Sequence, residues 1–237
     1  MTSASVLRVF VGWDSREQDA YDVAVHSLRR HASVPLTITS LKQEDLRAQD
    51  LFWRERDPLA ATEFTYTRFL TPYLSGYAGQ ALFFDCDFLW TADVAELLAL
   101  VDPGRAVSCV HHQHKPREET KMDGAIQTQY PRKNWSSLMV FNCAHPSTRE
   151  LTLDAVNTQS GAYLHRMQWA ADEEIGALAP TWNWLEGWCE PEPGTIPKAI
   201  HFTRGGPWFA QWRNVAFADL WLEEFERVKR ATAHVEA

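Results

Sequence analysis

The chain has 237 residues, of which 45% are hydrophobic and 23% are charged, the ordinary mixture of a folded globular protein. Its formal net charge of −8 argues against a nucleic-acid-binding protein and against more than peripheral contact with anionic lipid. The four cysteines form no CxxC pair, and no signal peptide or membrane span is evident, so we expect a reduced, cytoplasmic protein.

A strand–helix–strand unit is expected at the start of the chain. Residues 7–11 form an apolar, strand-like run that ends at Gly12-Trp13-Asp14, and residues 36–41 form a second such run. Two overlapping capping boxes predict that a helix lies between them: Asp14 with Glu17, and Ser15 with Gln18. The turn after the first strand of such a unit is a natural nucleotide site.

The later elements continue this alternation. We expect further strands over residues 81–84, 106–110, 137–141 and 199–202. We expect helices over residues 43–52, 65–74, 94–101, 172–178 and 217–228, and one capped by Ser147 and Glu150. No repeat and no glycine-serine linker divides the chain. We therefore predict a single α/β domain, residues 1–237, with a mostly parallel central sheet flanked by helices.

Asp85-Cys86-Asp87 is the most informative motif. It directly follows the apolar run of residues 81–84, so two carboxylates are delivered at the end of a buried strand. Carboxylates held apart from water need a neutralising partner, and a hard divalent cation such as Mg²⁺ or Mn²⁺ provides one. The other interpretation is that Asp85 caps a loop that Asp87 opens. We favour the metal site, because ligands of open α/β sheets bind at the carboxyl ends of strands.

Two other features allow more than one interpretation. Eleven tryptophans are many for this length, and they are either core residues or platforms on which sugar rings stack. Residues 111–131 are long, polar and without period, which is more typical of a functional loop than of an accident. His111, His112, His114 and Lys115 lie there, and neighbouring strand residues point to opposite faces, so one shared metal is unfavourable. We interpret the segment as an acceptor-side loop.

Four segments, in this order, resemble the GT-A-fold glycosyltransferases, and most closely family 8, a retaining family that includes glycogenin and bacterial galactosyltransferases. They are Gly12-Trp13-Asp14, then Tyr66-Thr67-Arg68 leading to Asp85-Cys86-Asp87, then Asp172-Glu173-Glu174 followed by Trp182-Asn183, and finally His201-Phe202 with Gly205 and Pro207-Trp208. The resemblance spans almost the whole chain. It implies a nucleotide-binding part over residues 1–110 and an acceptor-side part over residues 111–237.

The resemblance also implies the roles of individual residues. Asp85, Asp87 and His201 would bind Mn²⁺ or Mg²⁺, which holds the diphosphate of a nucleotide-sugar, most simply a UDP-sugar. Other residues would contact the donor: Gly12, Trp13, Asp14, Tyr66, Arg68, Cys86, Arg204 and Gly205. Family 8 has a lysine where this chain has Gly206, and we expect Arg204 to replace it on the phosphates.

Asp172 and Glu173 resemble the acidic pair that faces the donor sugar in the family. A carboxylate at Glu173 can attack the anomeric carbon, or the leaving diphosphate can itself help to deprotonate the acceptor, and we prefer this second, front-face route. The two acids can also be explained as favourable charges at a helix N-terminus. The implied acceptor is a saccharide or glycolipid, in the setting of surface polysaccharide or glycolipid assembly.

Two rival functions stay open. A protein that binds nucleotide-sugars without turnover would keep the same motifs. A phosphatase of the haloacid dehalogenase type also has DxD at a strand end, but that strand normally opens the fold, whereas here a strand–helix–strand unit precedes it.

Overall fold

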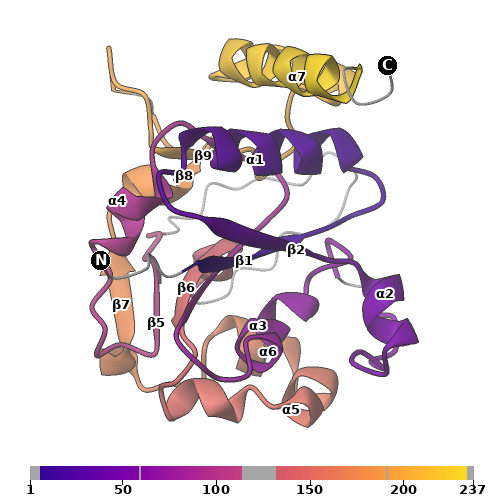
Figure 1. Cartoon of the computed structure of the whole chain (residues 1–237), viewed down its shortest axis with the longest axis vertical. Coiled ribbons are helices and arrows are strands. Elements are labelled where there is room, and N and C mark those ends of the chain that lie inside the picture. Colours follow the sequence, from indigo (N-terminus) through magenta and orange to yellow (C-terminus); the bar gives the residue numbers. More distant parts are fainter. Residues whose placement is uncertain (1–5, 59, 114–131, 191, 234–237) are drawn as a thin grey trace.

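The computed structural model describes residues 6–58, 60–113, 132–190 and 192–233. They form a six-stranded sheet with helices on both faces, and a three-stranded sheet beside it (Figure 1). The predicted α/β fold is confirmed.

Five of the six strands of the large sheet run in the same direction. The strand order is β2-β1-β3-β6-β5-β7, and β6 is antiparallel to both of its neighbours. The bounds are β1 Leu7–Gly12, β2 Leu36–Leu41, β3 Gln80–Phe84, β5 Val107–Val110, β6 Leu138–Asn142 and β7 Ile175–Leu178. The expected strands of this sheet are therefore confirmed to within a residue or two.

The small sheet brings a late segment of the chain to the Asp85-Cys86-Asp87 turn. Its strands are β4 Phe88–Trp90, β9 Ala199–His201 and β8 Trp184–Leu185. β4 follows Asp87 directly and pairs antiparallel with β9, with Phe88 opposite His201. This register is what places His201 beside the aspartates, although 114 positions of sequence separate it from Asp87.

Helices cover both faces of the large sheet. α1 and α7 stack on one side, and α3, α5 and α6 lie on the other (Figure 1). The bounds are α1 Gln18–His31, α2 Gln43–Ala48, α3 Thr71–Leu74, α4 Val94–Leu98, α5 Leu153–Thr158, α6 Gly161–His165 and α7 Ala218–Ala233. None of the helices in the described part of the chain is both long and apolar enough to cross a membrane.

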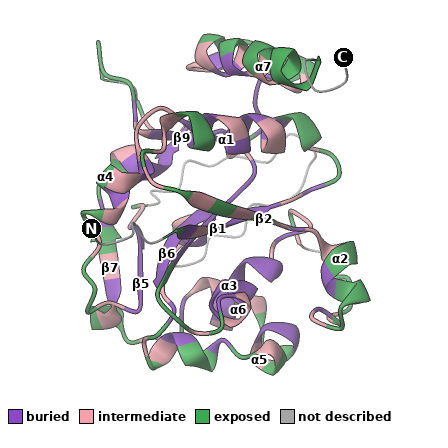
Figure 2. Ribbon diagram, viewed as in Figure 1, coloured by how far each residue is buried: buried purple, intermediate pink, exposed green. Residues whose placement is uncertain are grey.

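Alternation along the strands builds two cores. In β3, Leu82 and Phe84 pack with Leu28 of α1, whereas Phe83 packs with Phe69 on the opposite face. Figure 2 shows buried residues concentrated in the central strands and exposed residues along the outer helices. The central strands are buried on both faces, which is why they are continuous apolar runs, whereas the edge strand β2 alternates between partly buried and exposed residues.

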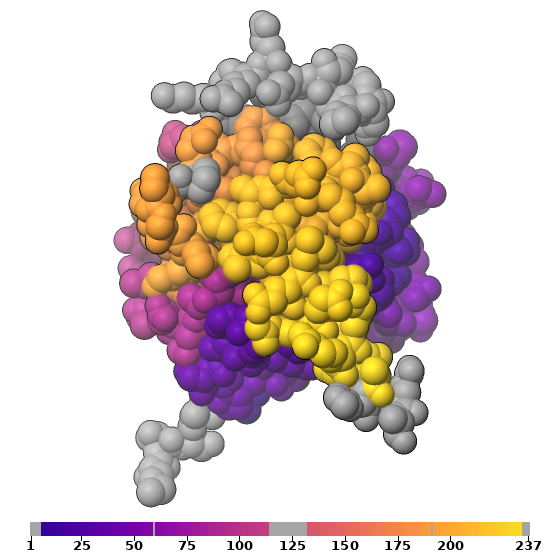
Figure 3. Space-filling model, turned by 90° about the horizontal axis from the view of Figure 1, so that it is seen from above, coloured from indigo at the N-terminus to yellow at the C-terminus, as the bar shows by residue number. Residues whose placement is uncertain are grey.

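A third apolar cluster fixes α7 over the small sheet. Trp221 of α7 packs with Trp184, Ile200 and Val23, and seen from above α7 forms much of that face of the molecule (Figure 3). Five of the eleven tryptophans are buried: Trp90, Trp169, Trp182, Trp184 and Trp221. For these five, the core interpretation is the right one.

Residues 172–178 do not form the helix expected there. A single 3₁₀ turn at Asp172–Glu174 is followed by strand β7, which pairs in parallel with β5. Gly176 fits the strand because a Cβ there would lie 2.6 Å from Ser108 Oγ.

The other helix expectations erred mainly at the boundaries. The helix expected over residues 65–74 is a 3₁₀ turn, Thr67–Leu70, continued by α3, and the segment capped by Ser147 is 3₁₀ as well. Neither capping box forms at α1, whose N-cap Glu17 makes no side-chain cap bond. Asp14 instead accepts from the backbone N–H groups of Arg16 and Glu63, which closes the loop before the helix.

Candidate metal and nucleotide site

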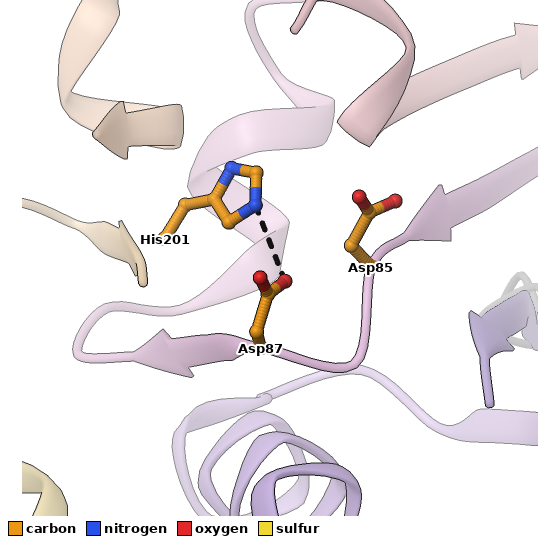
Figure 4. A group of neighbouring side chains, drawn as sticks. All are labelled: Asp85, Asp87 and His201. Carbon is orange, nitrogen blue, oxygen red and sulfur yellow. Dashed lines mark ion pairs between the residues drawn. The ribbon is translucent and has the colours of Figure 1, made fainter. Parts of the chain in front are cut away.

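Asp85, Asp87 and His201 converge at one point (Figure 4). Each offers a ligand atom, and the three atoms lie within 4.8 Å of one another. Asp85 and Asp87 come from the turn between β3 and β4, and His201 ends β9. Within the described residues, this is the group of histidine, cysteine and acidic side chains that could hold a metal ion. The predicted convergence of the three is therefore found in the structure.

Asp85 is held by a buried arginine. Arg68 Nη1 donates to Asp85 Oδ1 at 2.7 Å and to the carbonyl oxygen of Ser136 at 2.8 Å. Burial raises the pKa of Asp85 to about 7, against the lowering effect of Arg68. Arg68 therefore forms a buried ion pair with Asp85 rather than a surface one. In this structure its guanidinium is engaged by Asp85 and Ser136 and is not free to bind a phosphate.

His201 is oriented by Asn183. The Asn183 amide donates to Ser137 Oγ at 2.9 Å, so its Oδ1 faces His201 Nδ1 at 3.0 Å and accepts from it. The ring also stacks on Phe88, with centroids 4.5 Å apart. The proton therefore sits on Nδ1, and Nε2 points toward Asp87, 3.2 Å from Oδ1. Holding a histidine by its second nitrogen in this way is typical of metal ligands.

The arrangement suits a divalent cation. Asp87 Oδ1 is buried and has no well-aligned hydrogen-bond donor among the described residues, although His201 is close. Burial alone would lower the pKa of His201, but the carboxylate of Asp87 raises it above the usual 6.5. Two carboxylate oxygens and one imidazole nitrogen form a donor set that Mn²⁺ accepts. The residues present fit the predicted metal.

The loop after β1 is folded tightly against its surroundings. A Cβ on Gly12 would lie 2.5 Å from the Phe64 ring, so only glycine fits there without movement. Asp14 is fully buried, and although burial opposes it, the Arg16 guanidinium at 2.7 Å holds the pKa of Asp14 below its usual value. Trp13 donates to Gln18, and the Lys42 ammonium lies 4.6 Å from its ring. The carboxylate of Asp14 is therefore engaged by groups of the protein itself, and its role in this structure is to fix the conformation of the loop.

Other predicted donor contacts are also engaged within the protein. The Tyr66 hydroxyl donates to Asp57, and the Arg54 guanidinium covers its ring. Arg204 Nη2 donates to Glu186 Oε2 at 3.1 Å. Gly205 has φ = +111°, a conformation that glycine permits, and a Cβ there would lie 2.8 Å from Trp212. The donor-binding roles of Tyr66, Arg204 and Gly205 stay predictions.

Asp172 and Glu173 are not brought to the metal triad. Ile175 at the start of β7 is level with Val107, Phe141 and Ala81 across the sheet, whereas Asp85 follows the other end of β3. Glu173 precedes Ile175, so it lies toward the opposite edge of the sheet, and the exposed Asp172 pairs with Arg132. Their catalytic role stays a prediction that these contacts do not support.

Of the predicted acceptor-side loop, residues 111–131, the structure describes only residues 111–113. His111 stacks on Trp135 with centroids 3.9 Å apart, and the Arg132 guanidinium lies 5.4 Å from the same ring. His114, Lys115 and the rest of residues 114–131 lie outside the described residues.

Sequence reasoning missed Glu17. Its Oε2 lies 3.4 Å from Cys86 Sγ, so a third carboxyl borders the Asp85-Cys86-Asp87 turn. Burial, together with the charge of Asp87, raises the pKa of Glu17 to about 7. The only signal in the sequence was its position in the loop after β1, where it was interpreted as a capping residue.

Comparison with known sequences places the chain in a family. Protein CDI of Arabidopsis thaliana is 54% identical over 226 residues, which cover 94% of this chain and 87% of that protein. The chain belongs to the Protein CDI family. No protein-family model matches it.

Solved structures show that the chain has the GT-A fold of glycosyltransferases. The bifunctional glycosyltransferase WbbM has a TM-score of 0.64 at 18% identity over 95% of this chain, and the galactosyltransferase LgtC has 0.59 at 13% over 93%. The glycosyltransferase GlyE of Streptococcus pneumoniae has a TM-score of 0.59 at 13% identity over 98% of this chain. The chain spans half of the WbbM chain, 64% of GlyE and 96% of LgtC. These identities establish the fold alone.

Proposed function

We propose that the protein is a metal-dependent glycosyltransferase that moves a sugar from a nucleotide donor, most simply a UDP-sugar, to a saccharide or glycolipid acceptor. The observation that carries the proposal is the convergence of Asp85, Asp87 and His201 at the carboxyl end of β3. The GT-A fold shared with three glycosyltransferases supports it.

The chain's own residues prepare the site for a diphosphate. Arg68 keeps Asp85 in place, Asn183 fixes the His201 tautomer, and Asp87 carries an oxygen without a well-aligned donor among the described residues. A divalent cation bound to these residues would stabilise the negative charge that develops on the leaving diphosphate. Arg204 lies three residues after His201 and would need to leave Glu186 to reach a phosphate.

We further propose transfer with retention of configuration, as in family 8, with which the four sequence segments agree. A covalent intermediate on Glu173 has no support in the contacts, since the register of β7 carries this residue away from the triad. The front-face route needs no protein nucleophile and is the one that we propose.

A screen of nucleotide-sugars tests the proposal. In Mn²⁺ buffer, one donor is expected to raise the melting temperature and to be hydrolysed slowly, and EDTA is expected to abolish both effects. The matched variant Asp87→Asn should lose both effects while remaining folded. Binding without hydrolysis or transfer to any acceptor would indicate a binding protein. Hydrolysis of an aryl phosphate without turnover of any nucleotide-sugar would indicate a phosphatase instead.

A further inference from the structure

Glu17 places a third carboxyl next to the metal triad. It is the last residue before α1, beyond the carboxyl end of β1, and it contacts Cys86, the residue between the two aspartates. β1 and β3 are neighbours in the sheet, so the Glu17 carboxyl reaches the turn after β3 from the adjacent strand.

Glu17 is not one of the triad's ligands. The metal-capable group consists of Asp85, Asp87 and His201, and Glu17 lies outside it. The neighbouring Arg16 is no strong partner either, because its guanidinium binds Asp14 at 2.7 and 2.8 Å. Among the described contacts, the hydrogen-bond donor to the Glu17 carboxyl is the Cys86 thiol, which is a weak one. The Glu17 carboxyl can therefore accept further hydrogen bonds from a ligand.

The position of Glu17 is one where this class of sheet binds nucleotides. The chain passes from β1 to β2 on one side, and β3 then pairs on the other side of β1. A ligand crevice is expected at such a switch point, and acidic residues there commonly accept from ribose hydroxyls. A cavity of about 190 Å³ lies over the same loop and the start of α1, lined by Ser15, Arg16, Gln18, Asp19, Trp208 and Phe209, whereas the Glu17 carboxyl faces Cys86.

We infer that Glu17 selects ribonucleotide donors over deoxyribonucleotides, because its carboxyl accepts a hydrogen bond from a ribose hydroxyl of the donor. The inference rests on the proposed function. If the diphosphate lies at the triad, the ribose is the next group of the donor. Glu17 contacts Cys86, which lies between the two aspartates of the triad, so its carboxyl is close to where that ribose would lie. The base lies farther from the phosphates and is the less suitable partner.

The test compares a ribonucleoside diphosphate with its 2′-deoxy and 3′-deoxy analogues. Binding is measured by calorimetry in Mn²⁺, starting with UDP and then GDP and ADP. The wild-type protein should bind one of the deoxy analogues at least about tenfold more weakly, the usual effect of one hydrogen bond to a charged group. Glu17→Ala should bind the ribonucleotide and the deoxy analogue about equally. Glu17→Gln, which keeps the volume, should retain only part of the preference. The control Asp45→Ala removes an exposed acid from α2 and should leave the preference unchanged.

Each contrary result has a distinct meaning. An equal ribose preference in wild type and Glu17→Gln, or no preference in wild type, would overturn the inference. Equal weakening of Mn²⁺ affinity and of both nucleotides in Glu17→Ala would assign Glu17 to the metal and also overturn it. If wild-type protein binds no nucleoside diphosphate in Mn²⁺, the proposed function itself fails.

Discussion

Arg68→Met is expected to destabilise the metal-free protein by about 3–5 kcal/mol, the usual cost of removing one partner from a buried ion pair. The Arg68 side chain is 6% exposed and that of Asp85 is 12% exposed, with 2.7 Å between Nη1 and Oδ1. The variant leaves the Asp85 carboxyl buried beside Asp87, and the carbonyl oxygen of Ser136 loses its donor.

The loss should depend on pH in a defined direction. Burial already raises the pKa of Asp85 to about 7, and removal of Arg68 raises it further. Protonation then relieves the unpaired charge more completely at pH 6 than at pH 8, so the variant should lose more stability at pH 8. Asp85→Asn added to Arg68→Met should recover part of the loss.

Urea unfolding in EDTA measures these effects. Lys229→Met removes an exposed ion pair with Glu226 and should change the unfolding free energy by less than about 1 kcal/mol. If Arg68→Met costs no more than this control, or costs the same at pH 6 and pH 8, the buried-pair argument is wrong.

Three further variants or conditions test other parts of the structure. Glu224→Gln should lose about 1–2 kcal/mol at pH 7, because Arg30 and His26 hold the buried carboxylate and, although burial opposes them, lower the pKa of Glu224. This contribution is fully present above the usual glutamate pKa of 4.5 and is lost as the pH falls through the lowered pKa of the folded state. The unfolding free energies of wild type and Glu224→Gln, measured in urea, should therefore converge in acid. A difference that stays constant with pH would refute this. Gly12→Ala should cost about 1–3 kcal/mol in urea unfolding, because the new Cβ would lie 2.5 Å from Phe64, and a neutral effect would contradict the packing. Mn²⁺ affinity, measured by calorimetry, should rise about tenfold or more between pH 6 and pH 8, since Asp85 (pKa about 7) and His201 must bind the metal without their protons; a flat profile would argue against these ligands.

The sequence predicted the central strands of the large sheet well because they are buried on both faces. Runs such as residues 81–84 are wholly apolar and remain strands in any plausible packing. Residues 172–178 were mispredicted because the choice between helix and strand is made by pairing with β5, which no local pattern contains. The capping boxes at α1 failed because Glu63, far along the chain, engages both cap residues: its backbone N–H donates to Asp14, and its carboxylate accepts from the Ser15 hydroxyl.

At the site, the sequence predicted the ligands better than their supports. Asp85 and Asp87 are marked by the strand before them, and His201 by its resemblance to a known motif. Asn183 was noted only as part of a motif, because its hydrogen bond to His201 depends on the pairing of β8 with β9. Glu17 was missed because its proximity to Cys86 follows from β1 pairing with β3.

The central claim is that Asp85, Asp87 and His201 together bind one divalent cation. Anomalous diffraction from crystals grown with Mn²⁺ and a nucleoside diphosphate tests it most directly. We predict one strong manganese peak contacting both carboxylates and the imidazole, with the diphosphate on its open side. A manganese ion bound elsewhere, or none at this turn under saturating metal, would contradict the account.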